Sequence, residues 1–198
     1  RAALETLRQP LEEREVTVSR VEASVTYPAN FQLVAAMNPC PCGHFPDRSR
    51  CRCTDGQITR YLQKVSGPML DRIDICVEAS PITYGDIRSS GNNESSREIR
   101  ARVEQARKIQ GERFAGENIR CNGEMSGRHI RKFCWLGREE EKFMEEIFKK
   151  LALSARMHDR ILKVARTTAD LAEEKKIRLA DLCEAVSYVK SRDKFWGN

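Results

Sequence analysis

The stretch Phe31-Gln32-Leu33-Val34-Ala35-Ala36-Met37-Asn38-Pro39 decides the fold class, because it is a short, nearly continuous apolar run that ends at an amide and a proline. Such a run is typical of a strand covered on both faces, as in a parallel α/β sheet. Ile75–Val77 is a second, shorter candidate strand, and a helical stretch at Asp55–Lys64 lies between the two. The order strand, loop, helix, strand predicts part of an α/β layered core, of which the sequence contains only the later elements.

The residues before this run predict a helix and a hairpin. Leu4, Leu7 and Leu11 recur at helical spacing within residues 1–13. Val16–Tyr27 then alternates apolar and polar side chains on both sides of a short turn near Val21–Ala23, which is a hairpin pattern.

The sequence changes character after Pro81. Residues 85–97 are rich in Gly, Ser and Asn and are typical of a linker. From there on, apolar residues recur at helical spacing in five segments, within Ile99–Ile109, Ile130–Cys134, Phe143–Leu151, Met157–Leu171 and Leu182–Val189. We therefore expect an α/β region at 1–80, a linker at 81–97 and an all-helical region at 98–198.

The charge of the chain is uneven. The formal net charge is +6; residues 1–80 hold 10 basic and 10 acidic side chains, whereas residues 97–138 hold 11 basic against 5 acidic. A basic stretch can follow a phosphate backbone, and a solvated helix face is the alternative interpretation. No apolar run is long enough to span a bilayer, so no contact with a membrane is expected.

The eight cysteines divide into a cluster and four single residues. Cys40, Cys42, Cys51 and Cys53 lie within 14 residues and can supply four thiolates to a tetrahedral zinc ion, which neighbouring arginines would help to keep deprotonated. His44 is an alternative ligand, and a metal-free reduced loop is the other interpretation. This distribution indicates a reducing compartment, and we expect the protein to be cytoplasmic.

Three further polar residues are candidates for chemistry, each with a structural alternative. Asn38 ends the predicted strand, where ligands of open α/β sheets bind, or it only forms a turn before Pro39. Arg72 either forms a local salt bridge or stabilises charge on a phosphoryl group held by a neighbouring subunit. Arg156 follows a predicted N-cap at Ser154, so it is a solvated residue or part of an anion site at a helix N-terminus.

Taken together, the chain resembles the magnesium-chelatase-like AAA+ ATPases of the ComM/YifB family, which are related to MCM-type helicases. The resemblance covers nearly the whole chain in motif order and rests on Leu4–Glu12, Val16–Arg20, Val34–Gly43, Ser66–Asp74, Leu153–Arg156 and Ile161–Thr167. It implies a partial AAA+ α/β core, with sheet strands and a hairpin, followed by an all-α helical lid.

The resemblance also implies roles for single residues. Asn38 would be sensor 1, which positions the attacking water, and Arg72 would be the arginine finger that acts on the adjacent protomer. Arg156 would be sensor 2, which reaches the nucleotide from the lid. Val16–Tyr27 would be the hairpin that projects into the central channel of related helicases, with Arg20 as its DNA-contacting residue. The family includes a hexameric DNA motor that promotes branch migration, so ATP, Mg²⁺, DNA and further copies of the chain are the implied partners.

The departures from the family pattern limit this implication. The sequence contains no G-x-x-x-x-G-K-[ST] and no apolar strand ending in Asp-Glu, which are the groups that hold ATP phosphates and Mg²⁺. Residues 1–13 resemble the helix that follows the second motif, which suggests a part of a longer protein. We expect this chain alone to be inactive as an ATPase. A motor acting on another substrate, as in magnesium chelatase, and a non-catalytic zinc-containing binding module are the alternatives.

Overall fold

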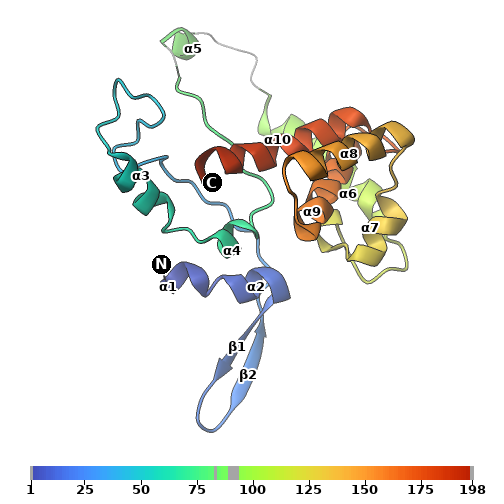
Figure 1. Ribbon diagram of the computed structural model, residues 1–198. Coiled ribbons are helices and arrows are strands. Elements are labelled where there is room, and N and C mark those ends of the chain that lie inside the picture. The colour runs from blue at the N-terminus through green and yellow to red at the C-terminus, as the bar shows by residue number, and fades with distance from the viewer. Residues whose placement is uncertain (1, 83, 89–93, 197–198) are drawn as a thin grey trace. The chain divides into compact units, whose positions relative to one another are not determined.

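A computed structural model describes residues 2–82, 84–88 and 94–196 of the chain (Figure 1). Two compact units are present. Unit 1 comprises Arg1–Cys76 and Ser191–Asn198, and unit 2 comprises Val77–Lys190. The boundaries expected from the sequence, at 1–80, 81–97 and 98–198, stay predictions.

Unit 1 begins with two short helices instead of the single expected helix. These are α1 (Ala2–Glu5) and α2 (Arg8–Glu13). Pro10 explains the break, because its ring would clash with the carbonyl of Thr6 in a continuous helix and it has no N–H to donate there. With α2 beginning at Arg8, Pro10 lies in the first turn, where no such bond is needed.

The predicted hairpin is confirmed. Strands β1 (Glu15–Ser19) and β2 (Ser24–Pro28) pair antiparallel, with Val16 opposite Tyr27. Thr17 and Thr26 join their hydroxyls across the ladder at 3.0 Å, and Ser19 and Ser24 do the same at 3.0 Å. Nearly every hairpin residue is exposed, and the ribbon projects from α2 (Figure 1).

The two predicted sheet strands are absent from the described residues, and this expectation was wrong. Neither Phe31–Met37 nor Ile75–Val77 forms a strand; Val34 is 84% exposed and Val77 is 74% exposed. A strand needs a neighbour to accept and donate its backbone hydrogen bonds. The only sheet in the described part of the chain is β1–β2, so these apolar runs have no ladder to join.

Between residues 29 and 76 the regular elements are two short helices. α3 (Asp55–Leu62) begins at Thr54, whose side chain forms a capping box with Gln57. α4 (Gly67–Leu70) begins at Ser66, whose hydroxyl accepts the N–H of Met69 at 3.2 Å.

All regular elements in the described residues of unit 2 are helices, as expected. Its elements are α5 (Tyr84–Arg88), α6 (Ser96–Arg113), the 3-10 turn η1 (Asn122–Glu124), α7 (Gly127–Phe133), α8 (Arg138–Lys150), α9 (Ala155–Leu171) and α10 (Leu179–Trp196), the last of which ends in unit 1. The predicted linker at 81–97 contains α5 and the start of α6, because Ser95 and Glu98 form a capping box. Residues 89–93 lie outside the described part.

The core of unit 2 combines apolar packing with one buried ionic cluster. Ile161, Leu182 and Ala165 are among 17 buried residues of the apolar core. Asp170 is fully buried and accepts hydrogen bonds from Arg113 and Arg166, the first at 2.7 Å. Because the carboxylate satisfies guanidinium groups from α6 and α9, it fixes these helices together.

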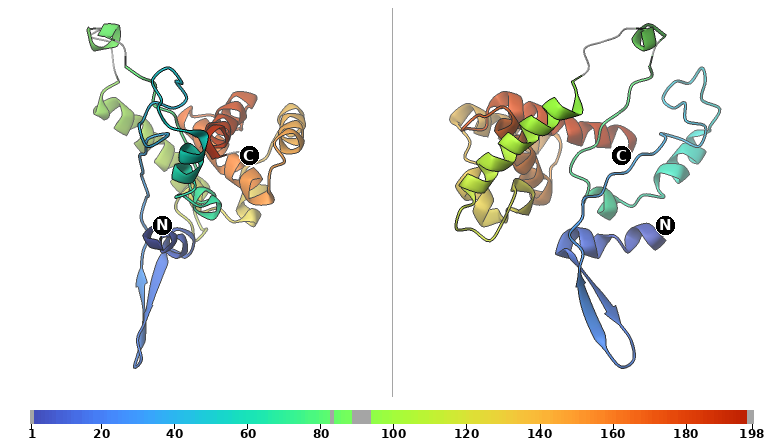
Figure 2. Two further views of the ribbon diagram at one scale, coloured as in Figure 1. Left: turned by 60° about the vertical axis from the view of Figure 1, so that its left-hand side comes forward. Right: turned by 180° about the vertical axis from the view of Figure 1, so that it is seen from behind.

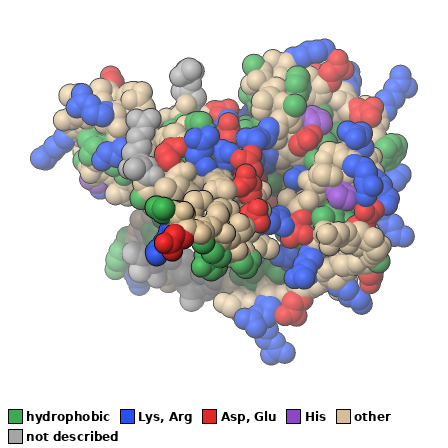
Figure 3. All heavy atoms as spheres, turned by 90° about the horizontal axis from the view of Figure 1, so that it is seen from below, with side chains coloured by type: hydrophobic (Ala, Val, Ile, Leu, Met, Phe, Trp, Pro, Cys, Tyr) green, Lys and Arg blue, Asp and Glu red, His purple; other side chains and the backbone are tan. Residues whose placement is uncertain are grey.

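No helix in the described ranges is long and apolar enough to cross a membrane. On the face shown in Figure 3, Lys and Arg side chains are interspersed with Asp and Glu side chains.

Candidate functional site

The cysteine loop is shaped by two consecutive turns. Gly43 donates its N–H to the Cys40 carbonyl at 3.0 Å, and the intervening Pro41 is favoured at the second position of such a turn. Asp47 then accepts the N–H of Ser49 at 3.0 Å, and the Cys51 N–H donates to the Asp47 carbonyl at 2.8 Å. These turns return the chain so that the second cysteine pair lies beside the first.

The four thiols of the predicted metal site lie together. The Sγ atoms of Cys40 and Cys42 are 3.4 Å apart, those of Cys40 and Cys51 are 3.8 Å apart, and those of Cys42 and Cys51 are 3.6 Å apart. The sulfurs of all four, Cys53 included, lie within 4.8 Å of one another. Tetrahedral zinc with bonds of about 2.3 Å requires sulfurs separated by about 3.8 Å. The cluster is therefore compatible with zinc, and His44 is not part of it.

The local backbone gives the four thiols different pKa values. Hydrogen bonds from the backbone of His44 and Arg52 lower the pKa of the Cys42 thiol to about 6. A backbone hydrogen bond from Cys42 favours the Cys53 thiolate, but burial and the neighbouring thiols outweigh it and raise the pKa of Cys53 to about 11. A cation bound here would replace protons that the crowded thiols otherwise retain.

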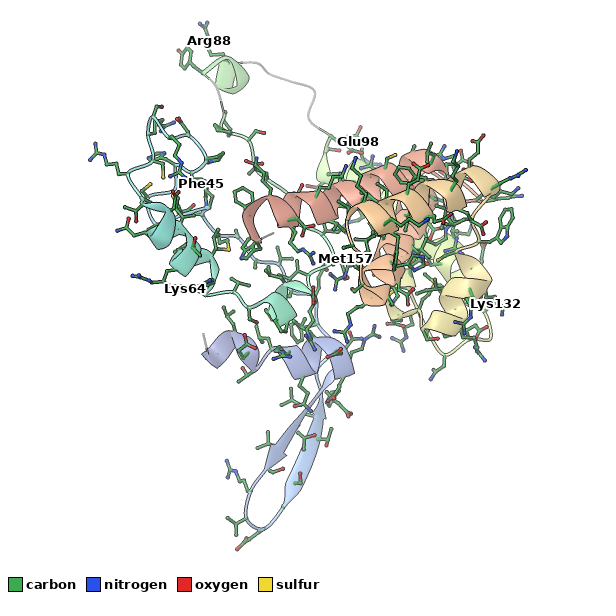
Figure 4. All side chains as sticks on the ribbon, in the orientation of Figure 1. Phe45, Lys64, Arg88, Glu98, Lys132 and Met157 are labelled. Carbon is green, nitrogen blue, oxygen red and sulfur yellow. The ribbon has the colours of Figure 1, made fainter. Side chains whose placement is uncertain are left out.

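A small apolar core supports the loop. Cys40, Ile58 and Leu62 are buried, and the partly buried residues packed against them include Phe45 and Trp196. The Trp196 indole N–H donates to the Leu62 carbonyl at 3.1 Å. Figure 4 labels Phe45 beside α3. The end of α10 thus covers the cysteine loop within unit 1, a contact that sequence analysis missed because α10 lies far along the chain.

Asn38, the predicted sensor 1 residue, lies against the cysteine loop. Its side chain is exposed, and a Cβ added to Gly43 would lie 3.7 Å from the Asn38 Nδ2. Gly43 has a φ of +81°, a conformation that side chains disfavour. The loop therefore folds back onto Asn38, which links the predicted sensor to the candidate metal centre.

Arg72, the predicted arginine finger, is held within unit 1. It forms an ion pair with Glu12 of α2 and donates to the Pro68 carbonyl at 2.6 Å. Its side chain is 13% exposed, and its Nε is buried without a hydrogen-bond partner in the described structure. Asp71, its neighbour, instead pairs with Arg192 at 3.2 Å. Sequence analysis expected a salt bridge as the alternative for Arg72 and did not identify Glu12 as the partner.

Arg156 lies in the first turn of helix α9 (Ala155–Leu171), and Arg20 lies in the turn of the hairpin. Ser154 caps α9 by accepting the Met157 N–H at 3.2 Å, which places Arg156 in the first turn as predicted. Arg20 lies at the hairpin tip, where its N–H donates to the Ala23 carbonyl at 2.8 Å. Both side chains are exposed. Arg156 belongs to unit 2, whereas Asn38, Arg72 and Arg20 belong to unit 1; the roles of all four stay predictions.

The class of protein follows from comparison with known families. Residues 1–87 match the family described as magnesium chelatase, subunit ChlI, and residues 93–189 match its C-terminal counterpart. The chain belongs to the magnesium-chelatase-like ComM/YifB family of AAA+ proteins.

Individual relatives match along almost the whole chain. The competence protein ComM of Haemophilus influenzae is 42% identical over 189 residues, which cover 95% of this chain and 36% of the relative. YifB of Escherichia coli is 43% identical over 190 residues, with 95% and 36% covered. The uncharacterized Rv2897c of Mycobacterium tuberculosis is 36% identical over 187 residues, with 94% and 37% covered. The chain thus spans little more than a third of the length of these relatives.

Proposed function

We propose that this chain forms part of an ATP-driven AAA+ motor that acts on DNA as a helicase or branch-migration factor. The observation that carries the proposal is the β1–β2 hairpin, a projecting two-stranded ribbon (Figure 2). Nearly all its side chains are exposed, and Arg20 lies in the turn between its strands. A two-stranded ribbon that packs little of its surface is suited to contact a partner. An arginine at its tip is suited to phosphate.

The nucleotide chemistry in this proposal is shared between copies of the chain arranged in a hexameric ring. Arg72 would act on ATP held by a neighbouring protomer, while Asn38 orients water and Arg156 contacts phosphate from the helical region. In this proposal the three side chains bind the phosphates of ATP and position the attacking water. The sequence has no phosphate-binding loop or Mg²⁺-holding acid of the usual pattern, so the 198-residue chain alone is expected to bind ATP weakly and not to hydrolyse it.

The finger role is tested by Arg72→Ala in a full-length protein that contains this sequence. Turnover should fall by about 10³-fold while ATP binding stays nearly intact, as for other lost arginine fingers. Arg60→Ala on α3, an exposed arginine with no ion pair in the described structure, is the matched control. Mixing the Arg72→Ala protein with a protomer defective in its phosphate-binding loop should restore part of the activity. No recovery in any mixture would contradict a role in trans.

The DNA part of the proposal is tested separately by ATPase assays with and without DNA. DNA should stimulate turnover, and Arg20→Ala should reduce this stimulation without changing the basal rate. If DNA has no effect on turnover while Arg72→Ala still abolishes it, the motor acts on another substrate, as in magnesium chelatase. If the full-length protein hydrolyses no ATP, the non-catalytic zinc-containing binding module becomes the better interpretation.

A further inference from the structure

Helix α6 carries a row of basic side chains that have no ion-pair partner within the described residues. These are Arg97, Arg100, Arg107 and Lys108, called here the α6 basic face; all four are exposed. Several other basic residues of unit 2 are paired: Arg102 with Glu94, Arg113 with Asp170, and Lys132 with Glu117. The row is therefore a set of cations that the described residues do not neutralise.

Helical geometry places the four residues on one side of α6. At 100° per residue they fall within an arc of about 100°, and they extend over about 16 Å of the helix axis. Ala106 and Gln110, which are buried against the rest of unit 2, lie on the other side. The view from behind in Figure 2 shows α6 across the outside of the helical unit.

The α6 basic face includes a glycine that leaves space for a partner to approach. Gly111 lies on the same arc, and a Cβ added to it would meet nothing within 4 Å. Glu104 is the acidic residue near the middle of the arc, which leaves a formal charge of +3 on these five side chains. The partner must therefore be an extended anion rather than a single ion.

We propose that the α6 basic face binds the phosphate backbone of DNA without reading its sequence. The length of about 16 Å corresponds to between four and five steps of about 3.4 Å along the duplex axis, so the face is long enough to span several phosphates of one strand. Three of the four cations are arginines, whose guanidinium groups bind phosphate through two hydrogen bonds. Among the described residues, none of the four contacts an aromatic ring, and α6 contains no aromatic side chain on which bases could stack. The inference rests on the proposed action on DNA and adds a second contact to the hairpin.

The test is DNA binding by the 198-residue chain, measured by fluorescence anisotropy with a labelled duplex of about two helical turns at several salt concentrations. The variant is Arg97→Gln/Arg100→Gln/Arg107→Gln. Each lost phosphate contact should reduce the slope of log affinity against log salt by about 0.9, so the triple variant should have a slope shallower by about 2.7 and an affinity at least about 10-fold lower at the lower salt concentrations.

The matched control removes the same charge from α8. Arg138→Gln/Lys142→Gln/Lys150→Gln changes three exposed side chains on a helix that also carries five glutamates. It should leave the affinity within about twofold. Circular dichroism of both variants should be unchanged, because all six positions are exposed.

Four outcomes decide between the inference and the proposed function. A selective loss in the α6 variant supports the inference. Equal losses in both variants would mean that only net charge matters and would overturn it. A loss with Arg20→Gln but not with the α6 variant would overturn it while the hairpin contact stands. Binding of poly-glutamate but not of DNA through α6 would assign the face to an acidic protein and overturn it as well.

Discussion

Unit 2 buries 17 residues in one apolar core, whereas the apolar core in unit 1 has three buried members, one of them a cysteine. The difference arises from the kind of element that each sequence encodes. The helices of unit 2 satisfy their own backbone hydrogen bonds, so they need from their neighbours only an apolar face. The apolar runs of unit 1 are suited to strands, and strands need partners for their backbone as well as for their side chains. Unit 1 therefore depends on local turns, on the end of α10 and, we expect, on a metal ion.

The largest effect should come from removing the metal from unit 1. Preparations in reducing buffer should contain about one zinc per chain, and Cys51→Ser should lose it because three thiolates no longer complete the tetrahedron. Amide exchange should then accelerate across residues 40–53, while the helices of unit 2 stay protected. Metal analysis with hydrogen exchange measures both.

Cys183→Ser provides the control, because Cys183 is an exposed cysteine of α10 outside the cluster. It should keep the zinc. A metal-free wild-type chain with a well-protected loop would end the zinc hypothesis and leave the family assignment standing.

In unit 2 the largest loss of stability is expected from a substitution of Asp170. Asp170→Ala leaves the buried Arg166 and the partly buried Arg113 without their carboxylate, which should lower the free energy of unfolding by about 3–5 kcal/mol. Asp159→Ala on the same helix, at a partly exposed position, should stay within about 0.5 kcal/mol. Denaturant unfolding followed by circular dichroism distinguishes the two. If Asp170→Ala lost no more unfolding free energy than Asp159→Ala, the ion pairs of Asp170 would add nothing to stability, and α9 would be held by packing alone.

A smaller effect is expected at the turn of the cysteine loop. Gly43→Ala should destabilise unit 1 by about 1–2 kcal/mol, because its φ of +81° places an added Cβ too near the backbone. Gly56→Ala on α3 should have the opposite sign, since nothing lies within 4 Å of the added Cβ and alanine favours a helix. Thermal unfolding of the zinc-loaded chain measures both. A stabilising Gly43→Ala would contradict the backbone conformation described for this turn.

The smallest effect concerns the pH dependence of unit 2. The Glu117 carboxylate accepts a hydrogen bond from Lys132, which holds the pKa of Glu117 below its ordinary value of 4.5. Its contribution to stability is therefore present above pH 4.5 and is lost as pH falls through the lower folded-state pKa. Glu117→Gln should flatten the fall in stability between pH 6 and pH 3, as measured by urea unfolding at each pH. Glu139→Gln, an exposed carboxylate of α8, should leave the slope unchanged.

Local patterns in the sequence predicted the elements that local forces determine. The five helical segments of the C-terminal region, the hairpin at Val16–Tyr27 and the N-cap at Ser154 were all visible as spacing or capping signals. The cysteine cluster was predicted for the same reason, because its four thiols lie within 14 residues and two tight turns bring them together.

The failures concern partners that are remote in sequence. The prediction of a strand at Phe31–Met37 was wrong, because an apolar run indicates a buried strand only where other strands flank it. The Glu12–Arg72 ion pair joins residues 60 positions apart, and Trp196 reaches Leu62 across 134 positions. No periodicity or capping signal encodes such contacts. Asp170 was overlooked because a carboxylate four residues after Arg166 also fits an exposed helix face.

The ion pair between Glu12 and Arg72 has a consequence for any anion that Arg72 binds. Glu12 is tethered in the same unit, so it acts as a competitor whose effective concentration does not change with dilution. An incoming phosphate is bound only in the fraction of molecules in which the pair has opened, and its apparent dissociation constant rises by the inverse of that fraction. Ionic strength weakens the pair and the phosphate contact together. The affinity of Arg72 for a phosphate should therefore vary less with salt than that of an arginine exposed on an open surface.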